Sequence, residues 1–276
     1  MSAVLDISLQ AASRRRAGWR RRTGWVLMSL VALFALAGPV VVGIDPAVQT
    51  LSDSLAPPGA RYRLGADLLG RDVLARLAHA AQLSLGLALL SAVTAAVPGV
   101  LLGVLASWRG GRVERSLVML SDAVLSVPGL LLVLLFAALA PGRHWALYVG
   151  LSLSLWVEYF RVSRAASRPV LAGDAVQASR LLGFGPAYLL RRHLLPALAP
   201  VLGTLLAFSA AQAVLALAAL GFVGVGLQPP TAELGLMMIE SLPHYEEAPW
   251  LIAAPVALLM LLVLGMMLLA GDGEGE

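Results

Sequence analysis

The sequence predicts an all-α polytopic membrane protein with six transmembrane helices, and two observations lead to this fold class. Fifty-nine per cent of the 276 residues are apolar and only 13% are charged. The mean hydropathy of +0.84 lies far outside the range of ordinary soluble domains. Apolar runs of about 20 residues, the length that a helix needs to cross a bilayer core, also recur along the chain.

Six such runs occupy most of the segment 25–270, which we interpret as the transmembrane domain. They cover residues 25–44, 83–105, 117–139, 146–160, 199–225 and 250–270. The fourth run is short and ends in Glu158, Arg161 and Arg164. A tilted or protein-shielded helix can nevertheless be short, so this run is retained as a predicted span.

The arginines are distributed unevenly between the connections, and this predicts the orientation. All twenty basic residues are arginine; the tail 1–24 holds six, the connection between the second and third runs holds three, and the segment 161–198 holds six. Positively charged residues are retained on the cytoplasmic side of a membrane, so these three segments are predicted to be cytoplasmic. Segments 45–81 and 226–249 are then external, and the tail 271–276 is cytoplasmic. We therefore expect a multi-pass protein of the cell (inner or plasma) membrane with both termini inside.

The N-terminal run has a second interpretation as a cleaved secretory signal. Arginines, an apolar stretch and Ala35-Leu36-Ala37 together resemble a signal peptide with its cleavage site. The apolar run continues past that site to Val42, which favours an anchoring helix.

The composition also excludes several kinds of chemistry. Without lysine there is no lysine-containing phosphate loop and no Schiff base, and without cysteine there is no disulfide, thiolate nucleophile or zinc–thiolate site. The four histidines, at positions 79, 144, 193 and 244, show no metal-binding spacing. The net charge of +4 does not indicate nucleic-acid binding, because most residues face lipid or other helices. We expect neither an enzyme nor a cofactor or metal bound by this chain.

The segment 174–198 is a polar interruption between the fourth and fifth runs. Asp174 is a candidate cap for a short helix with small and apolar residues at helical spacing, namely Ala175, Ala178 and Leu182. Gly183 is expected to end that helix, and Gly185-Pro186 to begin a second one that Pro196 stops. The pattern predicts a helix, a glycine hinge and a second helix. Such a segment can rest at the lipid headgroups or dock against another protein, and the small residues suit close approach by a protein.

The same segment resembles the EAA loop of ABC importer permeases, which reads Glu-Ala-Ala, three residues, Gly, nine residues, Ile, any residue, Leu-Pro. The corresponding residues here are Gln177-Ala178-Ser179, Gly183, His193 and Leu195-Pro196, with the spacing intact. The sequence departs from the pattern in Gln for Glu, Ser for the second Ala, and His for Ile.

Two further stretches resemble the C-type permease subunit of dipeptide, oligopeptide and nickel importers. The external stretch 64–77, LGADLLGRDVLARL, is similar to the signature L-G-T-D-x-x-G-R-D-[VI]-x-S-R-[LV] and includes Asp67, Gly70, Arg71 and Asp72. The outer-loop stretch 220–235 is similar to F-L-G-L-G-V-Q-P-P-T-P-x-W-G, with Leu234 in place of tryptophan. It includes Gln228, Pro229, Pro230, Thr231 and Gly235. The Gly271-Asp272-Gly273 sequence also matches part of the family's closing motif.

The resemblance implies the permease architecture of type I ABC importers and a function within a larger assembly. The expected partners are a homologous B-type permease, two ATPase subunits that bind ATP and Mg, and an external substrate-binding protein. The residues expected to couple the chain to the ATPase are Asp174, Gln177, Ala178, Ser179, Arg180, Gly183, Leu195 and Pro196. The resemblance favours di- or oligopeptides as the transported solute, with nickel or a nickel chelate as the alternative. An ion-coupled secondary carrier and a non-transporting membrane scaffold are the rival classes.

Several residues within the runs carry further expectations. Gly99 and Gly103 form a G-x-x-x-G pair, and three glycines thin the outer end of the fifth run, which permits close helix contact: Gly221, Gly224 and Gly226. Prolines can bend the runs at Pro98-Gly99, Pro128-Gly129 and Pro255 or be tolerated there. Asp122 and Glu158 are expected to pair with Arg115, Arg161 or Arg164.

The two external stretches have open interpretations. In the stretch 64–77, Asp67 or Asp72 is expected either to cap a turn or to contact the binding protein or the partner permease. The acidic segment 233–247 is expected to contact the docking protein.

Overall fold

The computed structural model describes the backbone of residues 2–271 and the side chains of residues 19–271. No strand occurs within these residues, which confirms the predicted all-α class. The predicted tail 271–276 lies outside the described residues apart from Gly271. The helices, in chain order, are α1 (Ser2–Val42), η1 (Leu51–Asp53), α2 (Val73–Arg109), α3 (Gly111–Leu125), α4 (Gly129–Leu139), α5 (His144–Ala172), α6 (Asp174–Leu181), α7 (Pro186–Leu189), the π-helical segment η2 (Leu190–Leu194), α8 (Leu195–Phe222), α9 (Leu234–Ser241), η3 (Leu242–His244) and α10 (Trp250–Ala270).

Four helices are long and apolar enough to cross a membrane. They are α1 from Trp19 to Val42, α2, the continuous helix Pro186–Phe222 that joins α7 to α8, and α10. The pair α3 and α4 qualifies as a fifth span when the two are taken together. The chain is therefore a polytopic helical membrane protein, as predicted.

The third predicted run, 117–139, is not one straight helix. It divides into α3 and α4, which are bent by 71° relative to each other. Pro128 occupies the N-cap of α4, and proline disfavours helical backbone at the residue before it, so the chain breaks here. Bending was considered possible at Pro98, Pro128 and Pro255. The chain bends at Pro128, whereas Pro98 and Pro255 lie inside unbroken helices.

The fourth predicted run, 146–160, lies within the longer helix α5. Its length and apolar composition do not identify α5 as a membrane span. It packs along α2, α4 and α8, so protein rather than lipid covers much of its surface. The count of six crossings remains a prediction.

Helices α2 and α5 approach closely through the predicted glycine pair. A Cβ atom on Gly99 would lie 2.5 Å from the carbonyl oxygen of Trp156, and one on Gly103 would lie 2.5 Å from that of Phe160. Neither position has room for a side chain. The G-x-x-x-G pair is therefore a helix contact within the chain, in agreement with the prediction.

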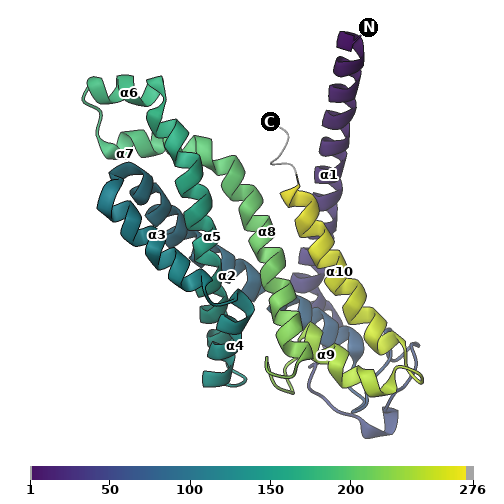
Figure 1. Cartoon of the computed structure of the whole chain (residues 1–276). Helices are drawn as coiled ribbons and strands as arrows, with labels where there is room; N and C mark the ends of the chain where they lie inside the picture. The colour runs from purple at the N-terminus through teal and green to yellow at the C-terminus, as the bar shows by residue number, and fades with distance from the viewer. Residues whose placement is uncertain (1, 272–276) are drawn as a thin grey trace.

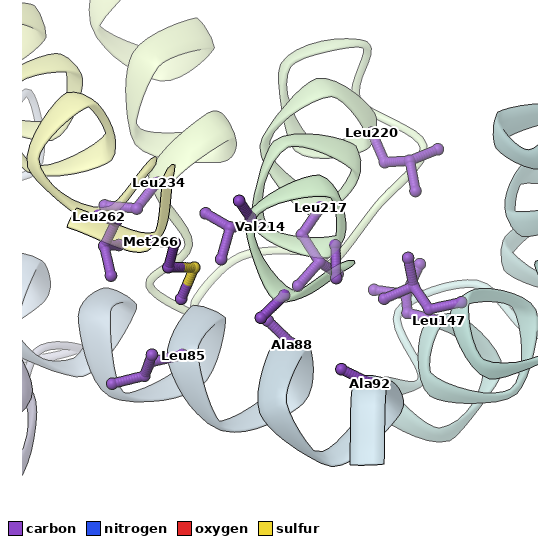
Figure 2. Close-up of a cluster of buried hydrophobic side chains, with 14 of the residues drawn as sticks. Leu85, Ala88, Ala92, Leu147, Val214, Leu217, Leu220, Leu234, Leu262 and Met266 are labelled. Carbon is purple, nitrogen blue, oxygen red and sulfur yellow. The ribbon is translucent and has the colours of Figure 1, made fainter. Parts of the chain in front are cut away.

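The main apolar core lies where α2 crosses α8 and α10. Figure 2 shows Leu85 and Ala88 of α2 beside Val214 and Leu217 of α8, with Met266 of α10 in the same cluster. These side chains are at most 8% exposed. The contact joins helices from both halves of the sequence.

The two ends of the molecule carry different segments. Figure 1 shows α6 and α7 at the same end as the start of α1, whereas α9 and the segment before α2 lie at the opposite end. The segments predicted to be cytoplasmic and those predicted to be external are thus separated in space.

The tight contact at Gly99 generates a stability prediction. We expect Gly99→Ala to destabilise the fold by about 1–3 kcal/mol, because the added methyl group overpacks the α2–α5 contact. Gly86→Ala is the matched control on the same helix, since nothing lies within 4 Å of its added Cβ. Thermal unfolding in detergent measures both variants, and equal transition temperatures would contradict the prediction.

Candidate functional site

The polar interruption between α5 and α8 forms a compact projection, which we call the foot (residues 174–198). Its first helix, α6, begins at Asp174, and the N-cap position belongs to Gly173. The Asp174 side chain makes no capping hydrogen bond, so the predicted cap is wrong. The extended backbone of Gly173 instead supplies the carbonyl that accepts from the N–H groups of Val176 and Gln177.

Gly183 ends α6, as predicted. It has a positive φ of 80°, a conformation that glycine adopts without steric cost. The N–H of Gly183 donates to the carbonyl of Arg180, and the N–H of Phe184 donates to that of Ser179. This pair of bonds is the Schellman arrangement that closes helix ends.

The second half of the foot begins as predicted and ends differently. Gly185 is the N-cap of α7 and Pro186 is in its first turn. Pro196 does not stop the helix, because the chain continues through the π-helical segment η2 into α8. In this segment the N–H of Leu195 donates to the carbonyl of Leu190, one residue further back than in an α-helix. The wider turn accommodates a proline ring that would otherwise clash with the preceding turn.

A small apolar core fixes the foot to the ends of the long helices. Val176 of α6, Leu189 of α7 and Leu194 of η2 are each at most 2% exposed. They pack with Val104 of α2 and Leu171 of α5 in one cluster. The Arg180 guanidinium also lies 5.3 Å from the ring centroid of Trp108, near the end of α2.

Polar and aromatic contacts join the two halves of the foot. The Ser179 hydroxyl lies 3.0 Å from Nε2 of His193, across the glycine hinge. The Tyr188 ring stacks on Phe184 at a centroid distance of 4.2 Å and meets His193 edge-on. The Gln177 amide donates to the Leu171 carbonyl and therefore points back toward α5.

The outer surface of the foot is apolar and exposed. Leu181 is 89% exposed and Leu182 is 75% exposed. The residues of the predicted small and apolar face are also exposed, as are six other predicted coupling residues, whereas Ser179 is buried. These exposed residues are Ala175, Ala178, Leu182, Asp174, Gln177, Arg180, Gly183, Leu195 and Pro196. Within the described chain, nothing covers this surface.

The external signature forms a second feature, which we call the charge ring (Asp67, Arg71, Arg76 and Glu240). Oδ2 of Asp67 accepts from Nε of Arg71 at 2.6 Å and also from Arg76. Oε2 of Glu240 accepts from Nη2 of Arg71 at 3.0 Å and from Nη2 of Arg76 at 2.7 Å. Each arginine thus bridges both carboxylates, and the ring joins α9 to the start of α2.

The rest of the signature builds the turn that carries the ring. Asp72 is the N-cap of α2 and accepts from the N–H of Ala75 at 2.8 Å. Gly70 has φ +70°, and an added Cβ would overlap the carbonyl of Thr50. Asp67, Arg71 and Asp72 are each at most 7% exposed. Of the two open interpretations, these contacts support the capped turn.

Sequence reasoning missed Arg76 and Glu240 as members of this cluster. Arg76 belongs to the signature stretch 64–77, and its place in that stretch could have identified it. Glu240 lies 164 residues further along the chain, and no local pattern connects the two.

The outer loop packs tightly onto the end of α8. Glu233 is the N-cap of α9 and accepts from the N–H of Leu236 at 2.8 Å. Gly221 and Gly235 lack room for a Cβ because α9 lies directly against α8. The predicted close helix contact is confirmed at Gly221, whereas Gly226 packs against the nearby backbone of Gly221 and Gly224 has open space around it.

Other predicted outer-loop residues are more accessible. Gln228, Pro229 and Pro230 are exposed, and Thr231 is half-buried. Pro230 and Thr231 line a shallow cavity of about 450 Å³ together with His79 and Gln82.

The two acids predicted to lie near membrane depth, Asp122 and Glu158, differ in their ion pairing. Asp122 pairs with Nη2 of Arg161 at 2.6 Å, as predicted. Arg164 and Arg168 both contact Glu114. Glu158 makes no ion pair among the described side chains, so its predicted pairing is wrong. Within residues 19–271 there is also no cluster of three acidic, histidine or cysteine side chains that could hold a metal ion.

The fold and the foot together define an integral membrane protein in which a projection with exposed leucines joins two long helices, α5 and α8. The family described as "Binding-protein-dependent transport system inner membrane component" matches residues 99–271, which is more than half of the chain. The chain belongs to this family of transport permeases. It is accordingly a non-catalytic component of an ABC transporter.

Curated relatives match almost the full length. The chain is 39% identical to the di/tripeptide transport system permease protein DppC of Pseudomonas aeruginosa over 259 residues, covering 91% of this chain and 84% of that protein. It is 31% identical to the probable D,D-dipeptide transport system permease protein DdpC of Escherichia coli, with coverage of 91% and 84%. Identity to the oligopeptide transport system permease protein OppC of Bacillus subtilis is 27%, with coverage of 98% and 88%.

The charge ring generates a stability prediction. We expect Arg76→Met to destabilise the fold by about 3–5 kcal/mol, because it leaves the buried carboxylate of Asp67 with one fewer cationic partner. Arg61→Met is the matched control, since Arg61 pairs with Asp53 at the surface and should cost less than about 1 kcal/mol. Thermal unfolding of the two variants checks this, and a control as unstable as Arg76→Met would contradict it.

Glu233 generates a pH prediction. Burial raises the pKa of the Glu233 carboxyl, and hydrogen bonds from the N–H groups of Gly235, Leu236 and Leu234 lower it by smaller amounts. A raised pKa in the folded state means that the fold binds the proton more tightly than the unfolded chain. This carboxyl therefore contributes stability at acidic pH that is lost as pH rises from about 4.5 through the raised value.

Glu233→Gln keeps an acceptor at the cap without the titrating group. We expect the melting temperature of this variant relative to wild type to increase as the pH rises above about 4.5, because only the wild type loses the contribution of the carboxyl. All other titrating groups are shared and cancel in the difference. A difference that does not change with pH would contradict the prediction.

Proposed function

We propose that this chain is the permease subunit of an ATP-driven importer of di- or oligopeptides and that the foot couples it to separate ATPase subunits. The proposal rests on one observation: the foot has exposed leucines on its surface, and the residues beneath them are buried against the long helices. Leu181 and Leu182 are exposed, while Val176, Leu189 and Leu194 beneath them are buried. Exposed apolar surface on a rigid projection is typical of a docking site for another protein.

The way in which the foot is attached suits the transmission of movement. Its helices are held to α2 and α5 by the small core around Leu171, and its second half runs without a break into α8. A displacement of the exposed tip would therefore act on α8 directly and on α2 and α5 through the small core. A segment that merely rested at the headgroups would not need this bracing.

The distribution of arginines supports a cytoplasmic foot and cytoplasmic termini. The arginine-rich start of α1, the α2–α3 connection and the foot are the segments predicted to be inside. Figure 1 places the foot and the start of α1 at one end. The external segments are then α9 and the residues before α2.

The family description supports the remaining partners of the proposed assembly. The assembly we propose contains a homologous B-type permease that forms the other half of the pathway, two ATPase subunits that bind ATP and Mg, and an external substrate-binding protein. This chain itself binds no nucleotide in the proposal. The compared relatives are named for dipeptide, tripeptide or oligopeptide transport, and this supports peptides over nickel as the transported solute.

The docking surface generates a functional prediction. We expect Leu182→Glu to reduce co-purification of the ATPase subunits and ATP-dependent peptide uptake by roughly tenfold or more, because it places a charge in an apolar contact. The stability of the variant should be unchanged, since the side chain faces solvent.

Leu51→Glu is the matched control, because Leu51 is a leucine of similar exposure on the opposite end of the chain. Pull-down of ATPase subunits and uptake into proteoliposomes measure both variants. Undiminished uptake by Leu182→Glu, or energisation by an ion gradient without ATP, would refute the proposed coupling.

A further inference from the structure

Two polar side chains in the middle of neighbouring long helices have no partner among the described residues. Glu158 is at the midpoint of α5, and Gln212 is in the middle third of α8. Gln212 is exposed and Glu158 is partly exposed, and neither carboxylate oxygen of Glu158 is enclosed by the protein. A carboxylate or an amide at this depth is costly in lipid and normally faces other protein or a water-filled path.

The two side chains lie at a similar depth. The Tyr159 hydroxyl is 2.5 Å from the Ser209 hydroxyl, which places the middle of α5 beside the middle of α8. Glu158 precedes Tyr159, and Gln212 follows Ser209 by less than one helical turn. Both therefore lie just beyond this contact, on the side away from the foot.

The two side chains also point to the same side of the α5–α8 pair. Trp156 of α5 lies against Gly99 of α2, and Val214 of α8 lies beside α2 in the apolar core (Figure 2). Glu158 and Gln212 are each two positions from these residues, which places them about 160° further round their helices. Both side chains thus lie on the surface of α5 and α8 that is turned away from α2.

The charges of this surface determine which ligand it suits. The three arginines of α5 are all paired with Asp122 or Glu114, so none of them neutralises Glu158. An uncompensated carboxylate attracts a cationic group and repels an anion. An ammonium can donate to Glu158, and the Gln212 amide can both donate to and accept from a peptide group.

We propose that Glu158 and Gln212 contact the peptide midway through its passage, with the ammonium of the peptide at Glu158 and a peptide group at Gln212. The inference rests on the proposed peptide importer function and assigns two residues of its translocation pathway. A free peptide supplies both the positive charge and the amide groups that these two side chains lack.

Thiol labelling tests whether this surface faces a water-filled path, and the chain has no cysteine of its own. Gln212→Cys is assembled with its partner permease and ATPase subunits in lipid nanodiscs and treated with a cationic methanethiosulfonate reagent. We expect this chain to be labelled at least about tenfold faster than with Met260→Cys, because the reagent requires a thiol that water reaches. Met260 is the matched control, since it is an exposed apolar residue at the midpoint of α10. Labelling no faster than in the control would overturn the proposal.

The charge of the reagent tests the role of Glu158. We expect Gln212→Cys to prefer the cationic reagent over an anionic one of the same size by about tenfold relative to a free thiol, because the carboxylate is nearby. Adding Glu158→Gln to this variant should remove the preference. A preference that survives Glu158→Gln, or that is absent from the start, would refute the assignment.

Peptide uptake tests the contact itself. The complete importer with its external binding protein is reconstituted in proteoliposomes, and uptake of radiolabelled alanyl-phenylalanine is measured. We expect Glu158→Gln to lower the initial rate by about tenfold and Glu158→Asp to stay within about threefold of wild type, since only the second keeps a carboxylate for the ammonium. Co-purification of the partner permease should be unchanged. Undiminished uptake by Glu158→Gln would overturn the proposal, and so would loss of the partner permease, which would assign Glu158 to a subunit contact.

The two proposals fail in different ways. Loss of the importer function would appear as no ATP-dependent peptide uptake by the complete wild-type system. If the wild type takes up peptide while Gln212→Cys is not labelled and Glu158→Gln transports normally, the importer function stands and the pathway residues are refuted.

Discussion

The structure depends on the close approach of α2 and α5 through Gly99 and Gly103. In a membrane, lipid solvates apolar side chains as well as protein does, so helices associate through packing and hydrogen bonds rather than through exclusion of water. The two glycines bring the backbone of α2 against that of α5, and Ser107 of α2 adds a hydrogen bond to the Arg164 carbonyl. This contact holds α5, which carries Glu158 and three arginines, within the bundle, and the foot extends from its end.

Both ends of the bundle use polar chemistry to fix short elements that have little core of their own. At one end, a Schellman turn, a serine–histidine contact and three buried side chains fix the foot. At the other end, four charged side chains fix α9 to the turn before α2. The difference is chemical: the foot leaves an apolar surface exposed, whereas the arginines and acids of the charge ring pair with one another. The exposed apolar surface of the foot suits a protein partner.

The fold class, the glycine contact and the hinge were predictable because each rests on local sequence. Apolar runs predict membrane helices, and glycines four residues apart predict a close helix contact. A Gly-Pro pair predicts the start of a new helix after a hinge. The continuation of α7 into α8 was not predicted, since proline often ends a helix, and the π-helical turn before Pro196 is not marked in the sequence. Asp174 failed as a cap because the preceding glycine took that position. Glu240 could not be connected to Arg76 from the sequence, because ion pairs between distant segments leave no periodic trace.

The uninterrupted helix from Pro186 to Phe222 has a mechanical consequence. Under the proposed coupling, a displacement of the foot reaches α9 through this one helix, because α8 contacts α9 at its other end. Gly221 has no room for a Cβ atom because Glu233 and Leu236 lie directly against it. A single covalent element thus connects the two ends of the molecule.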